Sequence, residues 1–368
     1  MINLHQQPNT ATLRNVTRGR SRGWIGVEIG TDGIKLAQLN RSADGFTFAA
    51  KWTLPDGQVA EAKDEDVRID SLQSQLKKIK GLRQLFAGRR CAAVLPMAFV
   101  EHRSFEIPRG TTLEQKRMAG EEMAAELGVE SNELALDCWE GAKDPFLDSS
   151  MVRLSAHAVS KRLAHCVGDQ LLRVGLECQV LDGLPCVLAR AVELAHLGND
   201  DEAVVAVDLS ATLPLVVLVK NGRPLFARTL RGVGLSTIMQ PLQDALTLST
   251  EECQQLLTRY GIAAFDQPPS AVVHRTTQLI AHPLQDLGNE IKRTIDYLRQ
   301  QFRSDRIGSV CLFGSGAIVK NLPNHLSHKL HLPVAPWALN EGDADAMDAT
   351  YGVAAGLSAL AWDADACL

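Results

Sequence analysis

Three short segments of the chain combine glycines, hydroxyls and charged side chains in patterns suited to binding phosphate. The first, V-E-I-G-T-D-G-I-K at 27–35, offers two glycines, a threonine hydroxyl and a lysine just beyond a turn. The second, V-D-L-S-A-T-L at 207–213, offers a carboxylate followed by two hydroxyls, and the third, L-F-G-S-G-A-I-V at 312–319, carries two glycines after an apolar run. Phosphate is bound by backbone N–H groups that point to one place, and glycine lets the chain approach closely. Each segment alone is usually structural, so the prediction depends on their order along the chain.

The elements expected around these segments alternate between strands and helices. Residues 23–30 and 34–40 are expected as two strands joined by a polar turn. Residues 204–210 and 213–220 repeat this arrangement, and Asn221-Gly222 predicts a two-residue hairpin turn into the next strand. An acidic residue near the end of the first strand precedes each polar turn. This weak repeat predicts two similar domains that face each other across a cleft.

A small α+β unit is expected between the two halves of the first domain. Residues 112–128 have helix-forming composition, a Thr112/Gln115 capping box and a terminal glycine. Strands are expected around this helix at 99–107, 134–140 and 151–160. Before the unit, residues 69–82 are expected as a helix. In the second half, the glycine turn after Phe313 is expected to lead directly into another helix.

Composition and charge exclude several classes of protein. The chain has 368 residues, 45% of them hydrophobic and 22% charged, which excludes a largely disordered chain. A net charge of −5 gives no support to general attraction to nucleic acid. Neither a membrane-spanning run nor a signal peptide is found, so we expect a cytoplasmic protein. Residues 1–22 hold four arginines and no acidic residue, which is typical either of a flexible leader or of a tail that contacts anionic lipid or an acidic partner.

The cysteines and histidines give no sign of metal chemistry. The eight cysteines include no C-x-x-C pair, so we expect reduced thiols, several of them in the core. His157, His165 and His196 are expected to be ordinary surface or hydrogen-bonded histidines.

The order of the three segments at 27–35, 207–213 and 312–319 resembles that of the phosphate-1, phosphate-2 and adenosine motifs of actin-like ATPases. Within that superfamily the chain most resembles PilM, the assembly protein of type IV pili, from about Gly23 to Gly356. WIGVEIGTDGIKLAQL resembles the opening hairpin of that family, and VLDGLPCVLARAVEL resembles the strand and helix that close its first domain. DLSATLPLVVLVKNGRPLFART resembles the second phosphate hairpin, and CLFGSGAIVKNLPNHL follows in family order.

The resemblance implies an α/β chain with the actin-like, ribonuclease H-like two-domain fold and an inserted α+β subdomain. After the leader at 1–22, the first domain is expected at 23–100, 176–198 and 340–361. The inserted subdomain is expected at 101–175 and the second domain at 199–339.

The resemblance also implies ATP or ADP as ligand, with Mg²⁺ held through water by Glu28 and Asp208. The nucleotide-binding residues that it implies are Glu28, Gly30, Thr31, Asp32, Gly33, Lys35, Asp208, Ser210, Thr212, Gln254, Gly314, Ser315 and Gly316.

Three departures from the family pattern weaken the expectation of tight ATP binding and of turnover. The family usually has Asp-x-Gly in both phosphate turns, whereas this chain has Glu28-Ile-Gly30 and Asp208-Leu-Ser210. The lysine of the family's Ala-Glu-x-x-Lys is Leu257 here, which cannot hydrogen bond a ribose or base. We therefore expect no catalytic residue and at most a weak ATPase.

By this resemblance, the leading hypothesis is a scaffold at the inner face of the cell membrane. It would bind the cytoplasmic N-terminal peptide of a PilN-like inner-membrane protein, and nucleotide would set closure of the cleft. Pilus and secretion roles remain open, as does homo-oligomerisation. The alternative is an active ATPase or sugar-kinase-like phosphotransferase, for which Asp137 and Asp182 are the candidate bases. A third hypothesis is a protein whose cleft is only structural and binds no nucleotide.

Overall fold

A computed structural model gives the fold of the chain in two compact units. Unit 1 comprises Met1–Ala191, Gly222–Phe226 and Val353–Leu368, and unit 2 comprises Val192–Asn221 and Ala227–Gly352. The structure describes residues 21–363 except for 44, 55–61, 63, 142–146, 196, 198–201, 267, 303–305 and 340–345. Most of the predicted leader and the histidine predicted at 196 therefore lie outside the described residues.

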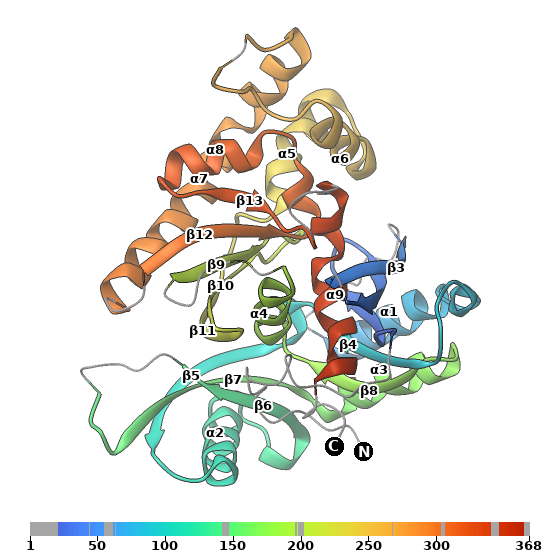
Figure 1. The fold of residues 1–368 in the computed structure, drawn as a ribbon, viewed down its shortest axis with the longest axis vertical. Helices are drawn as coiled ribbons and strands as arrows, with labels where there is room; N and C mark the ends of the chain where they lie inside the picture. The colour runs from blue at the N-terminus through green and yellow to red at the C-terminus, as the bar shows by residue number, and fades with distance from the viewer. Residues whose placement is uncertain are drawn as a thin grey trace. The chain divides into compact units, whose positions relative to one another are not determined.

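Unit 1 contains a five-stranded sheet in the order β3-β2-β1-β4-β8 (Figure 1). Strands β1, β2 and β3 form an antiparallel meander, and β1, β4 and β8 run parallel. Its strands are β1 (Ile25–Ile29), β2 (Ile34–Ser42), β3 (Gly45–Leu54), β4 (Arg90–Val94) and β8 (Glu177–Asp182). Helices α1 (Glu65–Lys77) and α3 (Lys161–Arg173) pack against each other, and both contribute buried leucines to one core with the sheet.

The opening hairpin is confirmed, but two neighbouring expectations differ from the structure. Strand β3 was not predicted, although Phe46, Phe48 and Trp52 lie in a run of strand-forming residues. Helix α1 begins at Glu65, not at residue 69, because the side chain of Asp64 accepts a hydrogen bond from Asp66 N and caps it. The helix ends at Lys77, five residues earlier than expected.

The inserted α+β unit is a three-stranded antiparallel sheet with one helix on its face (Figure 1). Its strands, in the order β5-β7-β6, are β5 (Glu101–Pro108), β7 (Met151–Ser160) and β6 (Leu134–Glu140), and its helix is α2 (Thr112–Leu127). Alternate residues of β7, among them Leu154 and Ala156, form a core with Ala119 and Met123 of α2. The capping box predicted at Thr112/Gln115 is wrong by one position: Thr111 and Glu114 form it, because Thr111 is the residue with extended backbone before the helix.

Unit 2 repeats the sheet of unit 1. Its sheet has the order β11-β10-β9-β12-β13, with β9 antiparallel to β10 and parallel to β12, as β1 is to β2 and β4. The strands are β9 (Glu202–Asp208), β10 (Leu215–Lys220), β11 (Arg223–Thr229), β12 (Arg306–Phe313) and β13 (Val334–Pro336). Asn221 and Gly222 both have positive φ, 50° and 67°, as the predicted hairpin turn requires. The internal repeat is therefore confirmed.

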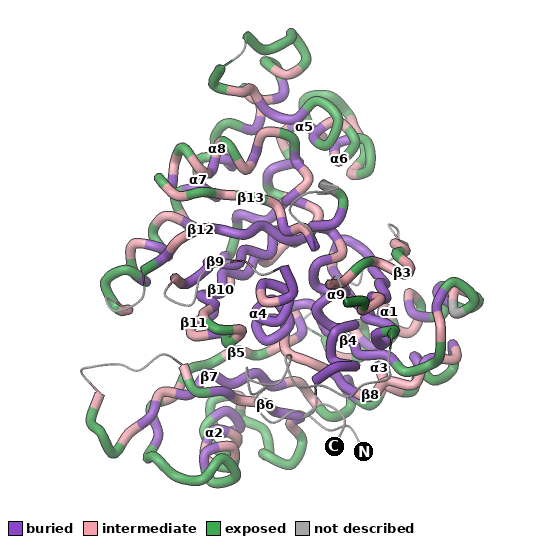
Figure 2. The backbone as a smooth tube through the Cα atoms, in the orientation of Figure 1, coloured by how far each residue is buried: buried purple, intermediate pink, exposed green. Residues whose placement is uncertain are grey.

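Helices surround the second sheet, whose strands β9, β10 and β12 are buried along most of their length (Figure 2). The remaining helices of the chain are α4 (Leu184–Leu194), α5 (Leu235–Leu246), α6 (Thr250–Arg259), α7 (Ala271–Gln301), α8 (Leu322–Leu330) and α9 (Gly352–Ser358). Short 3₁₀ turns lie at Leu82–Leu85, Met97–Phe99, Ser131–Glu133, Ser315–Ile318, Ala346–Tyr351 and Ala359–Trp362. The glycine turn after β12 thus leads into a 3₁₀ turn, and not directly into a helix as expected. In the described part of the chain, no helix combines the length and apolarity needed to cross a membrane.

Candidate functional site

The hairpin of β1 and β2 holds all six nucleotide-binding residues predicted in unit 1: Glu28 lies on β1, Lys35 on β2, and the other four in the turn. Gly30 N donates a hydrogen bond to Gly33 O at 2.8 Å and closes the turn. A Cβ on Gly30 would lie 2.5 Å from Oδ1 of Asp32, so any other residue would displace that carboxylate. Gly33 has a φ of 137°, which other residues rarely adopt. Both glycines are thus needed to form this turn.

The lysine of this turn is held inside unit 1. Lys35 Nζ donates to Glu28 Oε1 and to Asp32 Oδ2, both at 3.0 Å, and all three side chains are buried. Glu28 and Lys35 are register partners on β1 and β2, so the strand pairing itself brings the charges together. Burial raises the pKa of Glu28, while Lys35 acts in the opposite direction. The ammonium group therefore neutralises protein carboxylates in this structure.

One oxygen of this cluster remains suited to a cation. Glu28 Oε2 is buried and accepts no hydrogen bond from the described residues. An acceptor in this position fits the water shell of a Mg²⁺ ion, which favours carboxylate oxygens and retains several waters. Glu28 thus fits the metal role implied for it.

In unit 2, the end of β9 and the turn after β12 form a second glycine-lined site. Leu209 N donates to Phe313 O at 2.9 Å, and Gly316 N donates to Leu209 O at 3.1 Å. Gly314 has a φ of 80°, and a Cβ there would lie 2.7 Å from Oδ1 of Asp208. Asp208, Gly314, Ser315 and Gly316 are therefore brought together, although about 100 residues separate the two segments, as the parallel pairing of adjacent strands allows.

The turn at residues 210–213, which carries the Ser210 and Thr212 hydroxyls, packs against the start of α5. Ser210 Oγ donates to Leu213 O at 3.0 Å, so this hydroxyl stabilises the turn itself. A Cβ on Gly234 would lie 2.3 Å from Ala211 O, and Ser236 N donates to that same oxygen at 2.9 Å. Thr212 is half-buried in the same turn.

The helix predicted to hold the ribose and base is α6. Gln254 lies on it and is half-buried, while Leu257 is 1% exposed and belongs to the core of unit 2. The position that carries lysine in the family pattern therefore serves packing in this chain.

The inserted subdomain carries a polar cluster that the sequence analysis did not identify. On the face of its sheet opposite α2, His102 and Asp137 are both register partners of His157, and Trp139 lies close by. The ring centroids of His157 lie 4.6 Å from those of His102 and 5.0 Å from those of Trp139. His157 and Trp139 are each 6% exposed, yet Nδ1 and Nε2 of His157 and Nε1 of Trp139 have no hydrogen-bond partner among the described residues. The expectation of an ordinary surface or hydrogen-bonded histidine at 157 is wrong.

The two candidate bases differ in their environments. Asp182 forms a buried ion pair with Arg190 at 3.0 Å and accepts a hydrogen bond from Gly183 N, so it stabilises the loop before α4. Burial raises the pKa of Asp137 to about 7, although Lys116, at 3.4 Å, lowers it. Asp137 could therefore exchange a proton near neutral pH. Its register partner is His157, whose pKa is lowered by burial, so this histidine is not a cation beside Asp137 at neutral pH.

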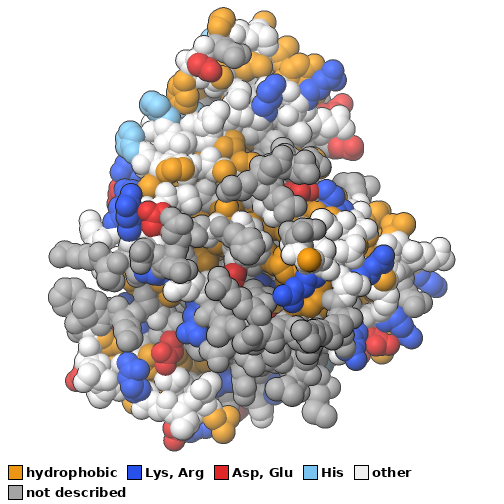
Figure 3. Space-filling model, viewed as in Figure 1, with side chains coloured by type: hydrophobic (Ala, Val, Ile, Leu, Met, Phe, Trp, Pro, Cys, Tyr) orange, Lys and Arg blue, Asp and Glu red, His pale blue; other side chains and the backbone are white. Residues whose placement is uncertain are grey.

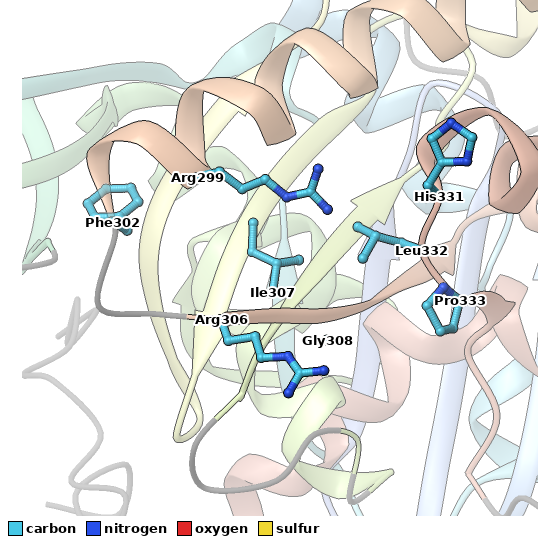
Figure 4. Close-up of a pocket in the computed structure, with 8 residues that line it drawn as sticks. All are labelled: Arg299, Phe302, Arg306, Ile307, Gly308, His331, Leu332 and Pro333. Carbon is cyan, nitrogen blue, oxygen red and sulfur yellow. The ribbon is translucent and has the colours of Figure 1, made fainter.

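Unit 2 has two surface features that hold none of the predicted site residues. A pocket of about 560 Å³ lies where α7 ends and β12 begins, with the side chains of Arg299 and Arg306 beside an apolar floor that includes Ile307 and Leu332 (Figure 4). Histidine side chains gather on the surface near α8 (Figure 3), where Phe265, 63% exposed, stacks on the rings of His325 and His328. Neither feature has a sequence pattern that would have identified it.

Comparison with solved structures defines the fold as that of the actin-like ATPases. No protein-family model matches the sequence, and neither does any curated protein. Among solved structures, the chain is similar to the PilM–PilN type IV pilus biogenesis complex, with a TM-score of 0.71, 19% identity, and coverage of 91% of this chain and 97% of that one. It is also similar to the ethanolamine utilization protein EutJ from Carboxydothermus hydrogenoformans, with a TM-score of 0.53, 13% identity, and coverage of 95% and 94%. The predicted actin-like fold and its resemblance to PilM are confirmed at the level of the fold.

Proposed function

We propose that this chain is a PilM-like scaffold of a type IV pilus or related secretion assembly. It binds the cytoplasmic N-terminal peptide of a PilN-like inner-membrane protein and works in the cytoplasm at the inner face of the membrane. The similarity to the fold of the PilM–PilN complex over 91% of the chain supports this proposal. That similarity extends over both units and the inserted subdomain.

The observation that carries the proposal is the polar cluster on the inserted sheet. A buried donor without an acceptor costs about 1–3 kcal/mol, so natural structures seldom leave several together. Trp139 Nε1 and one ring nitrogen of His157 are such donors in the described part of the chain. An extended peptide offers a carbonyl at every residue, and it can supply these acceptors once the residues that bury the two donors move aside. The cluster is therefore suited to a peptide ligand in a way that a fully satisfied core is not.

Strand edges give the peptide a second means of binding. In the order β5-β7-β6, both outer strands of the inserted sheet have one edge without a neighbouring strand in that sheet. An added peptide strand gains backbone hydrogen bonds from such an edge, and its side chains fill adjacent pockets. Edge pairing supplies affinity, and the indole N–H of Trp139, which lies on the outer strand β6, fixes the register of the peptide.

The test is calorimetric titration of the partner's N-terminal peptide into the Trp139→Phe variant. Phenylalanine keeps a large aromatic ring and removes the indole N–H, so we expect affinity to fall about 5- to 30-fold, as for one lost hydrogen bond of roughly 1–2 kcal/mol. Trp24→Phe is the matched control, because Trp24 lies elsewhere in unit 1 and its Nε1 is also buried without a hydrogen-bond partner among the described residues. If both variants bind as the wild type does, the cluster is not the peptide site.

We also propose that ATP or ADP binds with Mg²⁺ at the glycine turns and acts as a conformational ligand. Glu28 and Asp208 would hold the ion through water, and the turns at Gly30–Gly33 and Gly314–Gly316 would hold the phosphates. The apolar Leu257 and the neutralised Lys35 leave few groups to stabilise a transferring phosphate. We expect weak, Mg²⁺-dependent ATP affinity with hydrolysis far below the roughly 1–100 s⁻¹ of kinases. Turnover in that range with a small acceptor would favour the phosphotransferase alternative.

A further inference from the structure

Two cysteines of unit 1 lie next to each other on adjacent strands. Cys91 and Cys178 are register partners in the parallel pair β4–β8, and both side chains pack in the same core of unit 1. Neither forms a disulfide in this structure. No other two of the described cysteines are register partners on adjacent strands, and Cys166 instead accepts a hydrogen bond from the amide of Gln73.

The strand geometry allows these two sulfurs to bond. Neighbouring strands are about 4.8 Å apart, and disulfides join Cα atoms separated by roughly 4.4–6.8 Å. The register shifts directly after Cys91, where Ala92 pairs with Val180, so Gln179 is an extra residue on β8. A bulge of this kind changes the direction of neighbouring side chains and loosens the regular pairing. The pair can therefore close with little movement of the backbone.

The two thiols differ in the way that a stepwise oxidation needs. Cys178 is partly exposed, whereas Cys91 is fully buried. The neighbouring Cys91 thiol lowers the pKa of Cys178, whereas the neighbouring Cys178 and burial raise the pKa of Cys91. The more accessible sulfur is thus the better nucleophile, and the buried one lies beside it to complete the reaction.

We propose that Cys91 and Cys178 form a thiol-oxidation site that reacts with hydrogen peroxide to give a reversible intramolecular disulfide. In the first step, the Cys178 thiolate attacks one peroxide oxygen, the O–O bond breaks, and Cys178 becomes a sulfenic acid while hydroxide leaves and is protonated to water. In the second step, the Cys91 sulfur attacks the sulfenic sulfur, the S–S bond forms, and a second water leaves. The two thiols lose two electrons and two protons, and the peroxide is reduced to two waters.

The position of the pair gives the bond a structural consequence. Cys91 precedes the inserted subdomain and Cys178 follows it, so the disulfide closes a loop that contains β5, β6, β7 and α2. The bond would fix β4 to β8 at the base of that subdomain. This inference is independent of the proposed partner and nucleotide.

The experiment treats the full-length protein with stoichiometric hydrogen peroxide, blocks free thiols by alkylation, and maps peptides by mass spectrometry without reduction. The expected product is a cross-linked peptide that joins Cys91 to Cys178 and disappears after dithiothreitol. Cys166→Ser is the matched control, because Cys166 is partly buried like Cys178. In this variant the cross-link should form as in the wild type. In Cys91→Ser, the cross-link should be absent, and Cys178 should be labelled by dimedone as a sulfenic acid.

Two results would overturn the proposal. One is recovery of Cys91 and Cys178 as alkylated thiols under treatment that oxidises Cys166. The other is a cross-link from either residue to a different cysteine of the folded wild-type protein. Both are read from the wild-type protein, so they hold even if a cysteine variant fails to fold.

Discussion

The turn after β1 and the turn after β9 occupy equivalent places in two sheets of the same topology, but they are built differently. In unit 1, Lys35 lies between Glu28 and Asp32 and neutralises charge within the protein. In unit 2, Asp208 lies against Gly314, where a side chain would collide with its carboxylate. The turn after β1 thus contains a buried ion cluster, whereas the turn after β9 lies against the glycines that follow β12. The same fold therefore provides a buried ion cluster in one unit and, in the other, a close packing of glycines against a carboxylate.

Removing the lysine of the first turn should have the largest effect on stability. Lys35→Met leaves Glu28 and Asp32 buried together without their cation, and breaking a buried ion pair from one side costs about 3–5 kcal/mol. Denaturant unfolding measures this loss. Lys292→Met is the control, because its ion pair with Asp296 is half exposed and should contribute under about 1 kcal/mol. Similar losses in both variants would show that the first turn is not a structural ion cluster.

Adding one methyl group to the second turn should have the next largest effect. Gly314→Ala places a Cβ 2.7 Å from Asp208 Oδ1 at a φ of 80°, so we expect destabilisation of about 2–4 kcal/mol and weaker nucleotide binding. Gly88→Ala is matched to it, because Gly88 has the same φ of 80° but open space where its Cβ would lie. Thermal unfolding of both variants separates backbone strain from the contact with Asp208. Equal losses would contradict the close approach in the second turn.

Asp208→Ala should weaken nucleotide binding and leave the fold intact. A carboxylate that holds a hydrated cation or a charged hydrogen bond contributes roughly 1.5–3 kcal/mol, so affinity for Mg²⁺-ATP should fall about 10- to 100-fold. Calorimetry measures the affinity, and circular dichroism with thermal unfolding checks the fold. An unfolded variant, or an unchanged affinity, would make Asp208 a structural residue and contradict its place in the proposed nucleotide site.

Glu28→Gln should produce the smallest change, a difference in pH dependence. Because burial raises the pKa of Glu28 above its usual 4.5, the folded state binds this proton more tightly than the unfolded state does. That contribution to stability is present below pH 4.5 and is lost as pH rises through the higher folded-state value. The stability of the wild type relative to Glu28→Gln should therefore fall as pH rises above about 4.5. A flat difference across this range would show that Lys35 fully compensates the burial.

The sequence predicted features that depend on local chemistry and on order along the chain. Alternating strands and the Asn221-Gly222 turn predicted the repeated sheet, and the resemblance to a known family implied the actin-like fold. The sequence did not predict the ion pairs of Lys35 with Glu28 and Asp32, because the pair with Glu28 depends on the register between β1 and β2.

Tertiary packing also determines the features that the sequence analysis missed. His157 is buried because of the strands and loops packed around it, and Gly183 lies near enough that a Cβ there would approach its ring to 3.4 Å. No local pattern distinguishes such a histidine from one at the surface. The one-residue error in the capping box of α2 has a simpler origin, since Thr111 and Thr112 are adjacent and only backbone geometry selects between them.

The most direct measurement is calorimetric titration of the PilN-like partner's cytoplasmic N-terminal peptide into the full-length protein and into a variant that lacks residues 101–160. This deletion removes β5, β6, β7 and α2, and with them Trp139 and His157. We predict saturable binding to the full-length protein and no measurable binding to a deletion variant that remains folded by circular dichroism. Equal affinity for the two proteins would contradict a partner site on the inserted subdomain.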